Sequence, residues 1–191
     1  MFVTILVIRE QQMVKKITLV SGNKHKLREW KRIMPKDIVM EIVDLDLDEI
    51  QSMDLTRIIE DKAMRAYGQL GRPVVVEDVS ASLDELGGLP GPFIKYFETH
   101  MGEDALYRLA KLPNSRAKVT TLVAYYDGKK MLIAQDEEFG TVVPKKGRRS
   151  FGFDKVFVPD GHSKTYSQMS TTEKDSISHR AKAIKSLLDQ M

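Results

Sequence analysis

A glycine turn rich in basic residues separates two very different stretches of the chain. The turn reads SGNKHK (residues 21–26), follows the apolar run 17–20 and opens a lysine-rich amphipathic segment. Backbone N–H groups at a helix N-terminus attract anions, Gly22 permits close approach, and Lys26 adds a mobile positive charge. The segment therefore predicts a phosphate site. The alternative is an ordinary strand-to-helix turn with a solvated basic face.

Two adjacent acids, Glu77 and Asp78, follow the valine run 74–76. We expect them at the carboxyl end of a buried strand, where α/β sheets place ligand sites and an unpaired carboxylate would be costly. Carboxylate oxygens are the ligands that Mg²⁺ prefers, so the pair predicts a metal site. The alternative is a pair of solvated turn acids.

Four further segments carry weaker signals. The acidic connector DLDLDE (residues 44–49) could add one metal ligand, although most clustered acids are solvated. FGFD (residues 151–154) could stack on a flat base, a contact worth on the order of 1–3 kcal/mol, or could place two aromatic residues in the core. EKDSISHRAK (residues 173–182) holds a His-Arg pair that is either on the surface or in a site. The basic run PKKGRR (residues 144–149) is a solvated loop or a phosphate gate.

The elements that position these segments alternate between strand and helix and then form a hairpin. We expect strands at 17–20, 38–43 and 73–83, helices at 24–34, 55–70, 93–100 and 103–112, hairpin strands at 117–126 and 130–143, a short strand after 154 and a helical region from Ser170. Asp54 is the expected N-cap of the helix 55–70, and Ser170 with Glu173 fits a capping box. This order predicts a single α/β domain over residues 1–191 with a mixed β-sheet.

The composition is that of a soluble globular protein, with 42% apolar and 30% charged residues among 191. A net charge of +3 gives no reason to expect a nucleic-acid partner. The absence of cysteine excludes disulfides and Cys-ligated zinc, and fits a reducing compartment. The N-terminal apolar run lacks the flanks of a signal peptide and is shorter than the roughly 20 residues of a membrane span. Residues 1–12 are either an extension before a start at Met13 or an added strand.

Together, these segments resemble the inosine triphosphatase family, pyrophosphatases that remove non-canonical purine nucleoside triphosphates. The matching blocks are SGNKHK, VVVEDVSASLDELGGLPGPFIKYF, SFGFDKVFVPDG, KTYSQM and EKDSISHRAKAIKSL, in the family's order over about residues 17–188. The resemblance, strongest to eukaryotic-type members, implies an elongated mixed sheet flanked by helices, with two lobes around a central cleft. It also implies a cytoplasmic homodimer that hydrolyses ITP, dITP and XTP to the monophosphate and diphosphate with Mg²⁺, or Mn²⁺ as a substitute, and has no membrane or nucleic-acid partner.

The same resemblance implies a set of site residues. Asp78 would bind the metal and activate water, and Glu49 would be a second metal ligand, with Asp46 or Asp48 as alternatives because the connector differs in length. The predicted substrate contacts are Ser21, Gly22, Asn23, Lys24, His25, Lys26 and Lys95 toward the phosphates, and Phe151, Gly152, Phe153, Asp154, Lys174, His179 and Arg180 around the nucleoside. Lys62 and Glu77 are two further predicted substrate contacts.

The chain departs from the family's pattern at two positions. Many bacterial members have Asp-Asp-Ser-Gly where this chain has EDVS (residues 77–80), so Val79 offers the substrate no hydroxyl. Animal members have Trp at the position of Phe153, so stacking should be weaker here. If Arg180 faces the base, it can only donate hydrogen bonds, and it would pair with a 6-keto group but meet adenine donor to donor.

Two other functions stay open on the sequence. A related pyrophosphatase acts on modified pyrimidine nucleotides, but the FGFD and SHR segments count against it. A non-catalytic module could bind nucleotide or single-stranded nucleic acid with lysines, arginines and stacked phenylalanines. The adjacent acids count against that module, because they would repel phosphates unless a metal were present.

Overall fold

The computed structural model describes residues 15–148 and 151–191, so the predicted extension 1–12, Met13 and Arg149 lie outside the described residues. The strands are β1 (Lys15–Val20), β2 (Ile38–Val43), β3 (Val74–Leu83), β4 (Pro90–Gly91), β5 (Arg116–Tyr126), β6 (Met131–Val142) and β7 (Phe157–Pro159). The α-helices are α1 (Lys24–Ile33), α2 (Leu55–Leu70), α3 (Ile94–Met101), α4 (Ala105–Leu109), α5 (Thr171–Ile177) and α6 (His179–Gln190). Short 3₁₀ helices are η1 (Asp84–Leu86), η2 (Gly152–Lys155) and η3 (Tyr166–Gln168).

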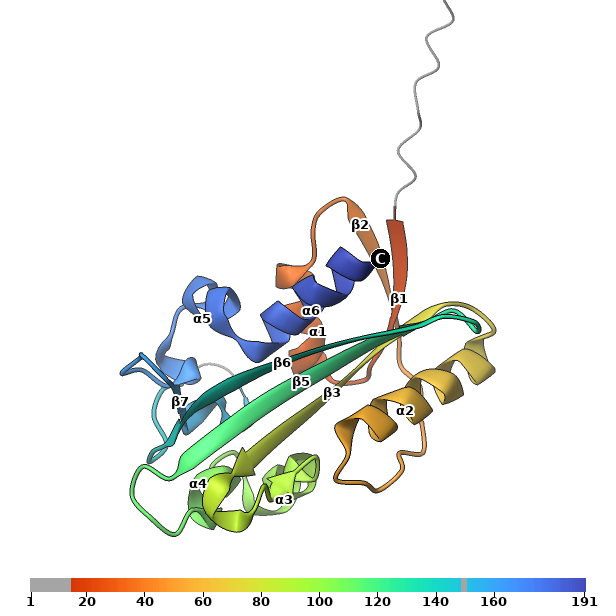
Figure 1. Cartoon of the computed structure of the whole chain (residues 1–191). Coiled ribbons are helices and arrows are strands. Elements are labelled where there is room, and N and C mark those ends of the chain that lie inside the picture. The colour runs from red at the N-terminus through yellow and green to blue at the C-terminus, as the bar shows by residue number, and fades with distance from the viewer. Residues whose placement is uncertain (1–14, 149–150) are drawn as a thin grey trace, which may run out of the picture.

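The strands form one mixed sheet in the order β2-β1-β3-β5-β6-β7, with β4 paired to β3 (Figure 1). β1 is parallel to β2 and β3, whereas the pairs β3–β5, β5–β6 and β6–β7 are antiparallel. The long β5–β6 hairpin confirms the predicted one and turns at Asp127, whose side chain accepts the N–H groups of Lys129 and Lys130. The mixed α/β fold is therefore confirmed.

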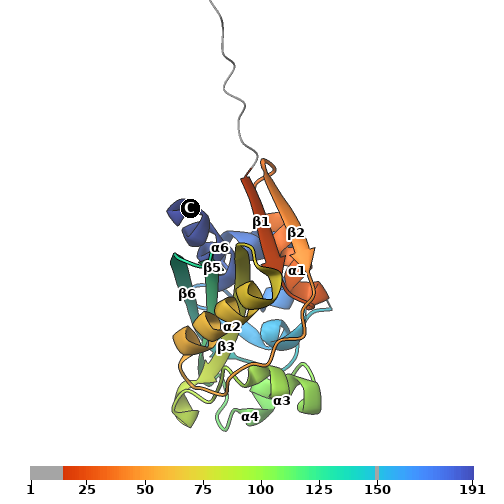
Figure 2. The ribbon, with the colours of Figure 1, turned by 90° about the vertical axis from the view of Figure 1, so that its right-hand side faces the viewer.

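Helices cover both faces of the sheet (Figures 1 and 2). Side chains along a strand alternate between its faces, and β3 follows this rule. Val74 and Val76 share a core cluster with Ile59 of α2, whereas Val75 shares another with Ile184 of α6. A third core cluster lies under α3 and α4 and is built around the C-terminal half of β3. The very apolar start of β3 is thus buried between two helices.

Local capping fixes the helices that carry predicted site residues. Asn23 caps α1 by accepting the N–H groups of His25 and Lys26. Asp54 caps α2 as predicted, and Gly71 ends that helix in the left-handed conformation at φ 63°. The predicted capping box of Ser170 is present at the start of α5.

Three predictions of the sequence analysis need correction. The strand expected at 73–83 is confirmed as β3, but Glu77 and Asp78 lie in its middle and not at its carboxyl end, because β3 pairs with β5 along its whole length, from Val74 opposite Tyr126 to Leu83 opposite Ala117. The acids instead lie just past the point where β1 ends. The helix expected at 103–112 is limited to α4. The C-terminal helical region is two helices, divided at Ser178, whose hydroxyl caps α6.

Candidate active site

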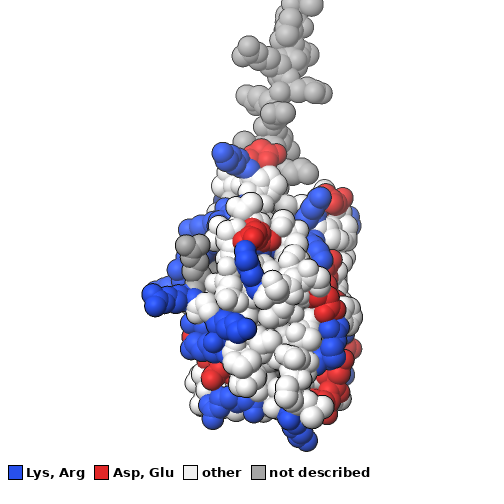
Figure 3. Space-filling model, turned by 90° about the vertical axis from the view of Figure 1, so that its left-hand side faces the viewer, with Lys and Arg blue, Asp and Glu red and all other residues white. Residues whose placement is uncertain are grey.

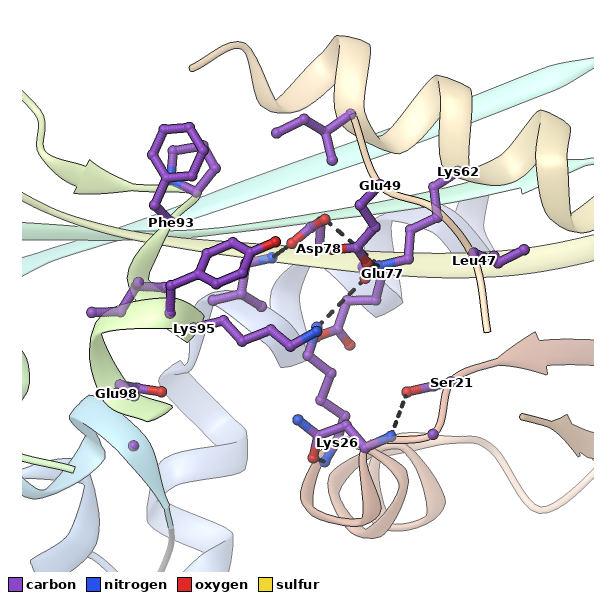
Figure 4. Close-up of a pocket in the computed structure, with 18 of the residues that line it drawn as sticks. Ser21, Lys26, Leu47, Glu49, Lys62, Glu77, Asp78, Phe93, Lys95 and Glu98 are labelled. Carbon is purple, nitrogen blue, oxygen red and sulfur yellow. Dashed lines mark hydrogen bonds and ion pairs between the residues drawn. The ribbon is translucent and has the colours of Figure 1, made fainter. Parts of the chain in front are cut away.

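A cleft of about 750 Å³ lies beside the middle of β3 (Figure 4). The shorter β1 leaves this part of β3 open, and the turn after β1, the acidic connector, the start of α3 and η2 form the walls. Of the predicted site residues, the cleft is lined by Ser21, Gly22, Asn23, Lys26, Glu49, Lys62, Glu77, Asp78, Lys95, Phe151, Gly152, Phe153, Asp154 and Arg180. Sequence segments more than 150 residues apart thus meet in one cavity.

Four predicted residues do not line this cleft. His25 and Lys174 line a smaller adjoining cavity of about 320 Å³, which shares Phe151 with the cleft. Lys24 is exposed in the first turn of α1. His179 is fully buried, and its ring nitrogens have no hydrogen-bond partner among the described residues.

Two hydrogen bonds fix the turn after β1. The Ser21 N–H donates to the carbonyl of Val43 at 2.9 Å, and the Asn23 N–H donates to the Ser21 hydroxyl at 3.2 Å. A Cβ on Gly22 would collide with the carboxylate of Asp44. The glycine therefore leaves room for the exposed Asp44 side chain, which would have to move if residue 22 carried a Cβ.

Asp78, Glu49 and Lys62 form the acidic end of the cleft. The Lys62 ammonium lies 2.6 Å from Oε1 of Glu49 and 3.7 Å from Oδ2 of Asp78. Burial alone would raise the pKa of Glu49, but the nearby Lys62 holds that pKa below its ordinary value. Among the described ion pairs, Glu49 is the connector acid that contacts Lys62, so the geometry favours it over Asp46 and Asp48 as the connector acid of the site.

These two carboxylates suit Mg²⁺ better than a metal that needs a complete protein cage. Within 15–148 and 151–191, no cluster of three or more His, Cys, Asp or Glu side chains could hold an ion. Mg²⁺ usually takes one or two carboxylates, keeps several waters and completes its shell with substrate phosphates. The donor set of Asp78 and Glu49 fits that pattern.

Glu77 is buried beneath the cleft floor and accepts three hydrogen bonds or ion pairs. Its Oε1 lies 3.0 Å from Nε of Arg180 and 3.3 Å from Nζ of Lys26, and its Oε2 accepts the indole N–H of Trp30 at 2.5 Å. Burial opposes ionisation, but Arg180 and Lys26 lower the pKa of Glu77 below its ordinary value. This geometry favours a role in orienting Lys26 and Arg180 over direct contact with substrate.

Glu29 extends these contacts into a larger network and was not predicted from the sequence. It accepts from Nζ of Lys174 at 2.7 Å and from Nη1 of Arg180, and Lys174 also lies 2.5 Å from Oδ2 of Asp154. Burial opposes ionisation, yet Arg180 and Lys174 lower the pKa of Glu29 to about 2. The buried ion network consists of Lys26, Glu29, Glu77, Asp154, Lys174 and Arg180. The formal charges of these six side chains balance.

The two phenylalanines of FGFD have different surroundings. Phe151 stacks on His25 with ring centroids 4.5 Å apart, and the guanidinium carbon of Arg180 lies 5.9 Å from its ring centroid. Phe153 is buried in the core and packs edge-on against Phe157. The core interpretation therefore holds for Phe153, and Phe151 is the better placed of the two to stack on a base.

His179 packs behind Phe153, against the ring of Tyr166. Burial, reinforced by Arg180 and Lys174, holds its pKa well below the ordinary value, so the imidazole is neutral. The predicted contact between His179 and the base therefore gains no support from its position.

Comparison with known proteins agrees with this arrangement. Residues 17–190 match the sequence profile of the Ham1 family. The chain belongs to the Ham1 family. It is 39% identical to inosine triphosphate pyrophosphatase 2 of Trypanosoma cruzi, with 90% of each chain covered. It is 35% identical to inosine triphosphate pyrophosphatase of Saccharomyces cerevisiae, covering 87% of this chain and 91% of that one. The resemblance found in the sequence, including that to eukaryotic members, is confirmed.

Solved Ham1 structures share the fold. The Staphylococcus aureus Ham1 protein superposes with a TM-score of 0.76 at 24% identity, covering 92% of this chain and 97% of that one. A nucleoside-triphosphatase, or dITP/XTP pyrophosphatase, of Mycobacterium abscessus gives a TM-score of 0.69 at 25% identity, covering 91% and 98%. None of the helices in the described part of this Ham1 chain has the length and apolarity to cross a membrane.

Glu98 is a second residue of this Ham1 site that sequence reasoning missed. Its Oε1 accepts the N–H of Phe153 at 2.7 Å. Gly152 has φ 59°, and a Cβ there would lie 2.6 Å from the same oxygen, so the carboxylate packs on the glycine. Burial raises the pKa of Glu98 to about 7, although the Phe153 N–H opposes the shift. The sequence offers little indication of a role for Glu98, which is an acid three residues after Lys95.

We expect Glu98→Gln to stabilise the protein at alkaline pH. The folded pKa of about 7 lies above the ordinary 4.5, so the folded state loses stability as pH rises between these values. Gln keeps an acceptor for the Phe153 N–H and carries no charge. Urea unfolding should show little difference from wild type at pH 5 and a gain on the order of 2 kcal/mol at pH 8.

Glu103→Gln is the matched control for this measurement. Glu103 is a neighbouring acid whose pKa is lowered by its hydrogen bond to Lys155, so its neutralisation should bring no gain at pH 8. If Glu98→Gln changed the free energy of unfolding by the same amount at pH 5 and pH 8, the raised pKa of Glu98 would be contradicted.

Proposed function

We propose that this protein hydrolyses non-canonical purine nucleoside triphosphates (ITP, dITP and XTP) to the monophosphate and diphosphate. The observation that carries the proposal is the convergence of Lys26, Lys62 and Lys95 with two carboxylates in one cleft. A triphosphate carries about four negative charges, so its hydrolysis needs cations to offset repulsion of the attacking water. The names of the inosine triphosphate pyrophosphatases among its relatives support the same substrate class.

Asp78 and Glu49 would hold Mg²⁺, for which Mn²⁺ could substitute. When bound, the ion would neutralise phosphate oxygens and fix their orientation. Lys26 and Lys95 would bind the phosphate chain, and Asp78 would accept a proton from the attacking water. Water adds across the linkage between the α- and β-phosphates, so one product is the nucleoside monophosphate and the other is diphosphate.

The other end of the cleft would hold the nucleoside. Phe151 offers an aromatic face, and Arg180 lines the cleft with guanidinium donors that cannot accept a hydrogen bond. Donors that face position 6 of the base would pair with the keto group of hypoxanthine or xanthine. Adenine has an amino group at that position, and unpaired buried donors cost roughly 1–3 kcal/mol each.

A substrate panel tests this selection. Diphosphate release should be fastest from ITP, dITP and XTP, slower from GTP, and at least about 100-fold slower from ATP, with no release when Mg²⁺ is omitted. Preference for UTP or a modified pyrimidine nucleotide would favour the related pyrimidine pyrophosphatase. Tight nucleotide binding without turnover would favour the non-catalytic module.

We further propose that the protein acts as a cytoplasmic homodimer without a nucleic-acid or membrane partner. Large apolar side chains, among them Leu89, Tyr96 and Leu112, are exposed at the end of the molecule formed by α3 and α4, where a second copy could cover them. Figure 3 shows one face, with basic side chains toward its left edge, mixed charges along its right edge and few charged side chains between them. Sedimentation equilibrium should give a mass of twice 21.7 kDa.

A further inference from the structure

The Lys62 ammonium lies between the two carboxylates of the acidic end (Figure 4). It is 2.6 Å from Oε1 of Glu49, 3.7 Å from Oδ2 of Asp78 and 3.4 Å from the carbonyl oxygen of Glu77. The ammonium donates hydrogen bonds to Glu49 and to the Glu77 carbonyl, and the longer contact with Asp78 is an ion pair. We call this set of contacts the Lys62 bridge. In it, a protein cation occupies the place between the two acids proposed to bind the metal.

Partial burial strengthens this bridge. The Lys62 side chain is 15% exposed, and those of Asp78 and Glu49 are 16% and 30% exposed. The ammonium thus has a carboxylate partner on two sides, and both contacts are partly shielded from bulk water. Attraction between charges at these distances is several times stronger here than in bulk water. An incoming cation must therefore displace the Lys62 ammonium from Glu49.

The charges determine when that displacement is favourable. Glu49 and Asp78 supply two negative charges, and Lys62 already offsets one. A divalent ion placed between the same carboxylates would face the ammonium at short range, with too little negative charge for both. A triphosphate brings about four further negative charges, and its oxygens offer the ammonium new acceptors.

We propose that Lys62 is a positioning residue that withholds Glu49 from the metal until a triphosphate enters the cleft. The inference rests on the proposed function, because it takes Asp78 and Glu49 as the metal ligands. The phosphates draw the ammonium away from Glu49, and the freed carboxylate joins Asp78. The metal therefore binds weakly to the free protein and tightly in the presence of nucleotide.

Lys95 provides a matched control. It lines the same cleft, and its charge also lowers the pKa of Glu49. Among the described contacts, however, Lys95 forms no ion pair with Glu49 or Asp78, whereas Lys62 contacts both. Lys95→Met removes one positive charge near the metal ligands, and Lys62→Met removes the same charge together with the bridge.

The experiment measures binding of Mn²⁺ from the electron paramagnetic resonance signal of the free ion, first with the protein alone and then with an α,β-methylene analogue of ITP, where the signal lost to the analogue without protein is subtracted. Without nucleotide, Lys62→Met should bind Mn²⁺ about tenfold or more tightly than wild type, and Lys95→Met less than about threefold more tightly. Lys62→Gln repeats the test should the methionine variant fold poorly. With the analogue, wild type should bind Mn²⁺ tightly.

A double-mutant cycle identifies the carboxylate that is withheld. Without nucleotide, Glu49→Gln should hardly change Mn²⁺ binding by the wild-type chain, because Glu49 is held by Lys62. The same change in Lys62→Met should abolish the gain in affinity. Equal gains in Lys62→Met and Lys95→Met, or a large loss from Glu49→Gln alone, would overturn the inference while leaving the metal site standing. Absence of Mn²⁺ binding even with the analogue would overturn the metal site, and the bridge's proposed role with it.

Discussion

Asp78→Asn should reduce diphosphate release from ITP by at least about 10³-fold and leave the fold intact. Asn keeps the oxygen that accepts the Val79 N–H at 2.7 Å, so the local backbone of β3 has no reason to change. It loses the negative charge that faces Lys62 and that would hold Mg²⁺, and it cannot accept the proton of the attacking water. Two contributions to the rate are removed by one substitution.

The measurement is kcat at saturating Mg²⁺ and ITP, with thermal unfolding recorded on the same preparation. Asp48→Asn is the matched control: Asp48 is an exposed acid that lines the same cleft, and its neutralisation should change kcat by less than about threefold. A near-normal kcat for Asp78→Asn would exclude Asp78 both as metal ligand and as base.

Arg180→Ala should lower the free energy of unfolding by about 3–5 kcal/mol, because it leaves buried carboxylates without their cation. The guanidinium is 4% exposed and contacts both Glu77 and Glu29, which are 1% and 7% exposed. Removal of Arg180 leaves Glu29 with Lys174 and Glu77 with Lys26 as their remaining cations. The sequence analysis places Arg180 at the base, and its burial shows that its loss must change stability as well.

Urea unfolding at pH 7 measures this loss, and Arg116→Ala is its control. Arg116 pairs with Asp160 at 2.7 Å on the surface, where the two side chains are 46% and 53% exposed. Loss of such a pair should cost less than about 1 kcal/mol. If Arg180→Ala also lost less than about 1 kcal/mol of unfolding free energy, the buried ion network would not depend on Arg180.

Arg180→Lys separates stability from base selection. It keeps the charge but loses the planar guanidinium, whose Nη1 contacts Glu29 and whose Nε contacts Glu77. We expect partial recovery of stability and a smaller ratio of ITP to ATP turnover than in wild type. Equal loss of both activities would assign Arg180 to the structure and not to recognition of the base.

The parts of the fold with strong local signals were predictable from the sequence. Helix α2 has its N-cap at Asp54, a continuous apolar stripe and a glycine stop at Gly71, all within one segment. The β5–β6 hairpin is similarly defined by two apolar strands around Asp127. Propensity, periodicity and turn chemistry agree in these segments, so the tertiary structure had nothing to override.

The features that were missed depend on contacts between distant segments. Glu77 and Asp78 were expected at the carboxyl end of a strand, but they lie in the middle of β3, just past the point where the neighbouring β1 ends. Glu29 reads as a surface acid of an amphipathic helix until α5 and α6 bring Lys174 and Arg180 against it. In neither case does the local sequence carry the information.

The nature of the bond that is cleaved tests the central claim most directly. ³¹P NMR of ITP incubated with the protein and Mg²⁺ distinguishes the two possible outcomes in one spectrum, because IMP, diphosphate, IDP and phosphate have separate resonances. The cleft of lysines and carboxylates around Asp78 predicts that IMP and diphosphate appear together in equal amounts, and that neither appears with Asp78→Asn. Appearance of IDP and inorganic phosphate as the first products, or of IMP and diphosphate at an undiminished rate with Asp78→Asn, would contradict it.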